Sequence, residues 1–177
     1  MSRDFPDWVD VERAARARRR FRGRARLAWL ERVLDQLDAP GAEEEIGFEL
    51  NAFVDDRGQP MIDVHVSGDV PMRCQRTLVR YRQPIDGRSR IAVVATEQAI
   101  DGLPGEIEPK LVPGGRLRLL ELVEDELLLA LPLVPRDPAS RPVTVTAGEW
   151  AADAPDEHPF AALAGLKGAP GQDEDSD

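Results

Sequence analysis

Strict alternation between arginine and small or apolar residues is the feature that most constrains the fold of this chain. The segment Arg20–Leu27 reads RFRGRARL, so every second side chain is an arginine. Side chains of a β-strand point to opposite faces with a period of two, whereas a helix would distribute these arginines around its circumference. The pattern therefore predicts a half-buried strand. One face of it carries a cationic row made of Arg20, Arg22, Arg24 and Arg26.

Other alternating segments predict a sheet around this strand. The expected strands are Glu44–Val54, Met61–Val66, Val70–Arg82 and Arg90–Thr96. Asp55–Gly58 is typical of a turn between the first two, and Pro84 and Asp86–Gly87 are expected to join the last two. Because the loops between consecutive strands are short, antiparallel pairing is favoured.

Helical patterns complete the expected fold. A short helix is predicted over Trp8–Arg19, capped by Asp7 or Asp10, and an amphipathic helix over the apolar positions from Trp29 to Leu37. The strongest helix is Leu117–Leu131, with leucines on one face and acidic residues on the other. Ala99–Gly115 is predicted to be a loop. The fold class is α+β, with a curved antiparallel sheet of five to six strands, and closure into a barrel is left open.

The chain length of 177 residues favours one domain. We expect it to span residues 1–167, with an irregular proline-rich stretch over 135–158 and a disordered acidic tail over 168–177. No apolar run approaches the roughly 18 residues of a membrane span, and the start of the chain lacks the apolar stretch of a signal peptide. A cytoplasmic location without membrane contact is therefore predicted.

Charge is distributed unevenly along the chain. The net charge is −10, but residues 1–90 carry a net +1 and residues 91–177 a net −11. Eight arginines fall between Arg13 and Arg26, an interval without any acidic residue. The acidic total therefore argues against a general DNA-coating protein without excluding a localised cationic surface.

Two interpretations of this arginine-rich segment remain open. Arg13, Arg16 and Arg20 are expected to add helical charge to the strand row, and a flexible polyanion such as RNA could follow these arginines. Alternatively, the row could pair across strands with Glu43, Glu45 and Glu49. Phe21 lies on the other face of the strand, so base stacking is not supported here.

A second arginine group surrounds the single cysteine. It consists of Arg73, Arg76, Arg80 and Arg82. Cys74 between these arginines could be a reactive thiolate, but a nucleophile needs a base, and only His65 and His158 are available. A small buried cysteine in a strand is the favoured interpretation.

The acidic residues of the predicted leucine-rich helix are a third candidate. The cluster consists of Glu121, Glu124, Asp125 and Glu126. The first three could bind Mg²⁺ in a nuclease, although such clusters are more often a solvated helix face. One cysteine and two distant histidines do not make a structural zinc site. The residues alone therefore predict a binding protein that is not an enzyme and has no metal or cofactor.

Three stretches, in matching order and spacing, resemble the YceD family, known as large ribosomal RNA subunit accumulation protein. They are LVEDELLLALPLVP at 122–135, CQRT at 74–77 and HPFAALAGLK at 158–167. The residues that carry the resemblance are Cys74, Arg76, Glu124, Asp125, Pro159 and Phe160. The chain departs from the family motif at Thr77, where the family has a second cysteine, so a metal held by paired cysteines is not expected.

The resemblance implies a cytoplasmic bacterial protein that acts in synthesis, processing or stability of the large-subunit (23S) ribosomal RNA. It implies no established enzyme activity and no known cofactor. We expect binding of pre-ribosomal RNA or an assembly particle through Arg13–Arg26 and Arg73–Arg82. The alternative is an acidic adaptor or holdase that shields a basic ribosomal protein and does not touch RNA.

Overall fold

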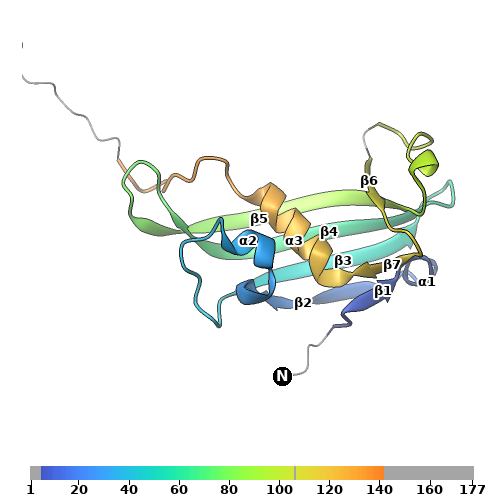
Figure 1. Ribbon diagram of the computed structural model, residues 1–177, viewed down its shortest axis with the longest axis horizontal. Helices are drawn as coiled ribbons and strands as arrows, with labels where there is room; N and C mark the ends of the chain where they lie inside the picture. The colour runs from blue at the N-terminus through green and yellow to red at the C-terminus, as the bar shows by residue number, and fades with distance from the viewer. Residues whose placement is uncertain (1–4, 106, 142–177) are drawn as a thin grey trace, which may run out of the picture. The chain divides into compact units, whose positions relative to one another are not determined.

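The computed structural model describes residues 5–105 and 107–141 and confirms the α+β class (Figure 1). The main sheet has five strands in the order β2-β3-β4-β5-β6. Their bounds are β2 Arg20–Arg26, β3 Glu45–Val54, β4 Pro60–Arg73, β5 Arg80–Val94 and β6 Glu108–Leu111. The first four strands pair antiparallel, and β6 pairs parallel with β5. Within the described residues the sheet is open, with β2 and β6 at its edges.

The remaining elements are short except for one helix. A two-stranded ribbon pairs β1 with β7. The bounds are β1 Trp8–Asp10, α1 Val11–Arg16, η1 Leu27–Trp29, α2 Glu31–Leu34, η2 Glu97–Ala99, β7 Arg116–Arg118 and α3 Leu119–Ala130. No helix of the described part has the length and apolar character needed to span a bilayer. The expected domain limits and the acidic tail lie largely outside the described residues and stay predictions.

The helices and one face of the main sheet enclose the hydrophobic core. Helix α3 packs against β4 and β5, and α1 packs against β3 and β4. Leu119, Val123 and Leu127 of α3 are almost fully buried, which confirms the apolar face expected for this helix. The strands contribute their even-numbered residues from β3 and β4, such as Phe48 and Val64. We call this the covered face of the sheet.

The expected division of the strands between residues 61 and 96 was wrong. Strand β4 continues to Arg73, a turn follows over residues 74–79, and β5 runs unbroken through Pro84 and Gly87. Continuous pairing with β4 overrides the turn preference of these residues. Gly87 allows α3 to pack closely on β5, because a Cβ atom at this position would lie 2.7 Å from Glu126 Oε1 and 2.8 Å from Ala130 Cβ of α3.

Both expected N-terminal helices are shorter than predicted. Trp8–Asp10 pairs with β7 as a strand, so the first helix covers only α1, with Asp10 as its N-cap. The Asp10 side chain accepts a hydrogen bond from the Arg13 backbone amide at 2.9 Å. The second helix is reduced to η1 and α2, because Leu30 between them has a non-helical backbone. The apolar residues are buried by these short turns without a continuous helix.

The expected loop over Ala99–Gly115 was also wrong, because it contains strand β6. This strand lies at the sheet edge, where the missing amide hydrogen of Pro109 is tolerated. The parallel pairing with β5 brings Lys110 next to α3, and this contact bears on the acidic helix residues described below.

Candidate functional site

The arginines of β2 lie on the face of the sheet opposite to α1 and α3, as the alternation predicted. Phe21, Gly23 and Ala25 of this strand point to the core, and Gly23 fits closely against Phe5 and Phe48. The arginine side chains between them therefore face solvent. We call this face, with its side chains from β2 to β5, the open face.

The arginine row is paired and exposed at the same time. Arg24 Nε lies 2.8 Å from Glu45 Oε2, and Arg26 lies 2.9 Å from Glu43. Arg20 donates to Asn51 Oδ1 at 2.7 Å, with Glu49 3.5 Å away. The expected cross-strand ladder is therefore present, yet the Arg20 and Arg24 side chains remain 66% and 70% exposed.

Arg22 differs from its neighbours in the row. The register places it opposite Glu49, but within the described residues its guanidinium has no carboxylate partner. It is exposed between Arg20 and Arg24, at the roughly 6.6 Å same-face spacing that follows from a rise of about 3.3 Å per residue. Arg22 is therefore the arginine of this row that is most available to an anionic ligand.

The open face continues across β4 and β5 in transverse rows. One row runs Arg22, Glu49, His65, Arg88, and the next runs Arg20, Asn51, Asp63, Arg90. The arginines thus lie on β2 and β5, with the acidic residues and His65 largely between them. Three strand spacings of about 4.8 Å separate the two arginine strands by roughly 14 Å. A shallow depression of about 530 Å³ lies over the middle of these rows.

Arg88 and Arg90 were missed at the level of sequence. Asp86–Gly87 has the composition of a turn, although Asp86, Arg88 and Arg90 alternate with small residues. In the structure, Arg90 binds both oxygens of Asp63 at 2.6 and 3.1 Å. Asp86 lies 2.8 Å from His65 Nε2 and 3.2 Å from Arg88 Nε. The hydrogen bond to His65 lowers the pKa of Asp86, so this carboxylate stays charged at neutral pH.

Arg13 and Arg16 do not extend the β2 row. Helix α1 ends at Arg16, and a left-handed backbone at Arg18, with φ of 48°, turns the chain into β2. Arg20 is therefore a strand residue, and the expected helical spacing with Arg13 and Arg16 was wrong. Because α1 packs on the covered face, its two arginines lie on another side of the sheet. Arg16 pairs with Glu12.

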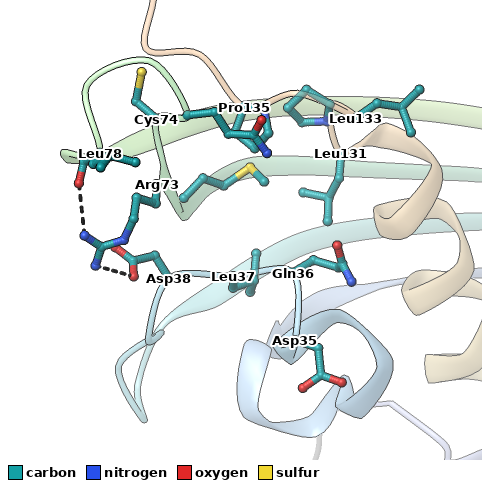
Figure 2. Close-up of a pocket in the computed structure, with 13 residues that line it drawn as sticks. Asp35, Gln36, Leu37, Asp38, Arg73, Cys74, Leu78, Leu131, Leu133 and Pro135 are labelled. Atoms are coloured by element: carbon teal, nitrogen blue, oxygen red, sulfur yellow. Dashed lines mark hydrogen bonds and ion pairs between the residues drawn. The ribbon is translucent and has the colours of Figure 1, made fainter.

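The second arginine group makes contacts within the chain around the β4–β5 turn. Arg73 bridges Asp38 at 2.9 Å and the Leu78 carbonyl at 3.0 Å, as Figure 2 shows. Arg76 donates to the backbone and hydroxyl oxygens of Ser140. Arg80 and Arg82 both approach Glu44. These arginines hold the turn in place and do not form one row.

Cys74 is buried, as expected, but it lies in this turn and not in a strand. Hydrogen bonds, first from the Thr77 hydroxyl and then from the Asp137 backbone, lower the pKa of the thiol to about 6. Its Sγ lies 3.7 Å from Ser140 Oγ, and in Figure 2 it points away from Leu37 and Asp38. His65, the described histidine, lies instead on the open face. Thr77, which stands where the family has its second cysteine, thus contacts Cys74 through its hydroxyl group.

The turn also contacts the segment that follows α3. The Gln75 amide donates to the Pro135 carbonyl at 2.9 Å, and both segments line a groove of about 340 Å³ (Figure 2). The fold thereby brings together two of the three stretches that carry the family resemblance. The third, including Pro159 and Phe160, lies outside the described residues.

The acidic residues of α3 form contacts that fix the helix. The Glu124 carboxylate accepts a hydrogen bond from the Arg32 backbone amide at 2.6 Å. The Asp125 carboxylate accepts hydrogen bonds from Lys110, at 2.6 Å, and from the Arg32 side chain. Lys110 reaches Glu121 at 2.8 Å. Partial burial opposes ionisation of Asp125, but the hydrogen bonds from Lys110 and Arg32 prevail and lower its pKa. Over residues 5–105 and 107–141, no three His, Cys, Asp or Glu side chains are grouped to hold a metal ion.

Replacing Asp125 by asparagine is expected to reduce the free energy of unfolding at pH 7 by about 1–3 kcal/mol, because Lys110 and Arg32 lose their charged partner. Since the folded pKa lies below the ordinary 3.8, this stabilisation is present above that pH and is lost as the pH falls through the folded pKa. Urea unfolding at about pH 7 and about pH 2.5 should show the difference between the two proteins shrinking at low pH. Glu43→Gln, at an exposed pair, should change stability by less than about 0.5 kcal/mol. An equal difference at both pH values would contradict this role of Asp125.

Comparisons with known proteins agree with the motifs. The family described as Large ribosomal RNA subunit accumulation protein YceD matches residues 62–167. The protein of that name from Haemophilus influenzae is 32% identical over 170 residues, which covers 92% of this chain and 96% of that protein. No solved structure matches the chain. The matched region includes Cys74, Arg76, Glu124 and Asp125.

Proposed function

The chain belongs to the YceD family, and from this premise we propose that it supports accumulation of large-subunit ribosomal RNA by binding the precursor RNA or its assembly particle. The relative from Haemophilus influenzae has large ribosomal RNA subunit accumulation in its name and is similar over nearly its whole length. We place the RNA contact on the open face. In this proposal the protein acts in the cytoplasm as a binding factor, without catalysis or cofactor.

The observation that carries the RNA contact is the row on β2. Arg22 is exposed and has no carboxylate partner among the described residues, while Arg20 and Arg24 flank it on the same face. A regular row of guanidinium groups can follow a phosphate backbone, and the planar guanidinium suits bidentate contact with phosphate oxygens. Such contacts need no base recognition.

The ion pairs of the open face do not prevent phosphate binding. Exposed ion pairs contribute only about 0–1 kcal/mol each, so exchanging a carboxylate for a phosphate costs little. Arg20, Arg24 and Arg88 all keep more than half of their side-chain surface exposed. The acids on the central strands, Glu49 and Asp63, would repel phosphate from the middle of the face. Phosphates are therefore expected along β2 and β5.

Simultaneous replacement of Arg22, Arg24 and Arg88 by alanine should weaken binding to large-subunit ribosomal RNA by about ten- to hundredfold. Each lost phosphate contact removes about 0.7 from the slope of log affinity against log salt, so the slope should fall by about 2. The measurement is a salt-titrated filter or anisotropy assay with the full chain. Circular dichroism of the variant checks that it is folded.

A matched control removes the same charge elsewhere. Arg57, Arg136 and Arg141 are exposed, lie outside the open face, and make no described side-chain contact with a carboxylate. Their triple alanine variant should retain affinity within a factor of about 2–3. If the wild-type protein did not bind the RNA at low salt, the RNA proposal would be wrong. If it bound only a basic ribosomal protein, the adaptor function would be favoured. If both triple variants lost RNA affinity equally, the open face would no longer be supported as the RNA-binding surface.

A further inference from the structure

The ribbon of β1 and β7 carries an aromatic and cationic cluster that is separate from the open face. The register pairs Trp8 with Arg118, Val9 with Leu117 and Asp10 with Arg116. Because side chains alternate along a strand, Trp8, Arg116 and Arg118 lie on one face of the ribbon. Val9 and Leu117 lie on the other face and pack into the core. In Figure 1 the ribbon lies next to α1.

Trp8 is not needed for this core. Its side chain is 50% exposed, whereas Leu117 is 4% exposed. The Arg116 guanidinium lies 5.8 Å from the centre of the Trp8 ring, which is within range of a cation–π interaction. Arg118 stands directly across the ladder from Trp8. The ribbon therefore presents an indole on β1 to solvent, beside two cationic groups on β7.

The arginines of this cluster are not committed to carboxylates. In the described residues, no carboxylate pairs with Arg116, Arg118 or Arg13 of the adjacent helix. Asp10, the acid on the same face of the ribbon, uses its side chain to cap α1. Asp7 and Glu12 also lie nearby in the chain, and Glu12 is paired with Arg16. The cluster thus combines an available aromatic surface with available positive charge.

We propose that Trp8, Arg116 and Arg118 form a base-stacking site for a single-stranded segment of RNA. Any base can stack on an exposed aromatic ring, and the two arginines on the neighbouring strand β7 can bind the phosphates next to that base. An acidic peptide would offer carboxylates to the arginines, whereas a nucleotide offers a phosphate to the arginines and a base to the ring. The inference rests on the proposed function in that the ligand is taken to be the same RNA as on the open face.

The test is binding of the full chain to single-stranded oligoadenylate. Trp8→Ala should weaken binding about five- to hundredfold, as expected from loss of one stacked base, without changing the salt slope. Trp8→Phe should restore most of the affinity, since a phenyl ring also stacks. Arg116→Ala with Arg118→Ala should lower the salt slope by about 1–1.5. An abasic oligomer of the same length should bind wild type and Trp8→Ala equally.

The outcomes separate this site from the open face. Unchanged oligoadenylate binding by a folded Trp8→Ala variant overturns the stacking site, even if the Arg22, Arg24 and Arg88 variant loses RNA affinity. Loss with Trp8→Ala but not with that triple variant supports the stacking site and overturns the open face. If the chain bound polyglutamate in a Trp8-dependent way and did not bind oligoadenylate, the stacking site would be overturned in favour of a site for an acidic protein. Equal loss for the abasic oligomer overturns stacking as its mechanism.

Discussion

Replacing Gly87 by leucine is expected to leave the chain largely unfolded at 37 °C. A Cβ atom at this position would lie 2.8 Å from Ala130 Cβ and 3.2 Å from Val66 Cγ2, closer than van der Waals contact allows. A longer side chain must therefore lift α3 from the sheet and expose leucines whose burial stabilises by about 1.5–3 kcal/mol each. A loss of about 4 kcal/mol or more is a large part of the 5–15 kcal/mol typical of a domain. Thermal and urea unfolding followed by circular dichroism measure it.

Three further variants separate this steric clash from a general effect of losing glycine. Gly105→Leu is the matched control, because a Cβ atom there has no neighbour within 4 Å, and it should change stability by less than about 0.5 kcal/mol. Gly87→Ala should cost about 1–3 kcal/mol through overpacking. Adding Ala130→Gly should recover part of that cost by removing the closest carbon atom. Additive losses in this double variant would contradict direct contact between Gly87 and α3 as the cause.

Elements that depend on one local period could be predicted from the sequence. The arginine strand, the strand after it and helix α3 each follow a clear period of two or 3.6 residues. The cross-strand ladder was also predictable as an alternative, since Glu43, Glu45 and Glu49 alternate opposite the arginines. Which arginine of the row stays unpaired depends on side-chain geometry between two strands, so Arg22 could not be singled out.

The missed features depend on contacts between distant segments. Pro84 and Gly87 have turn preferences that pairing along the whole of β4 overrides, and Arg88 and Arg90 were missed with them. The local sequence predicts a helix at Trp8, because the partner strand β7 lies more than a hundred residues away in the chain. The roles of Glu121 and Asp125 depend on Lys110, which lies in a strand that the sequence predicts as a loop.

Among the described residues, those that carry the family resemblance and those proposed to bind RNA lie in different parts of the fold. Glu124 and Asp125 fix α3, and Cys74 and Arg76 belong to the β4–β5 turn. The arginines of the open face project from the other side of the sheet. Changes to the motif residues should therefore act through stability, whereas changes to Arg22, Arg24 and Arg88 should act through binding. A cellular assay can separate these two effects.

Depletion of the protein in the cells that make it is expected to lower the large-subunit peak on a sucrose gradient, and a wild-type copy should restore it. A copy with Arg22, Arg24 and Arg88 replaced by alanine should fail to do so at wild-type protein level. If the dissociation constant rises tenfold, a site that was half occupied falls to about a tenth.

The Arg57, Arg136 and Arg141 variant, which loses the same charge, should restore the peak. Asp125→Asn should reduce protein level first, and overexpression should compensate for it, because its effect is on folding. A normal peak after depletion would count against the proposed role in ribosomal RNA accumulation. Full restoration by the open-face variant would leave that role intact and place the RNA contact elsewhere, with the Trp8 cluster as the next surface to test.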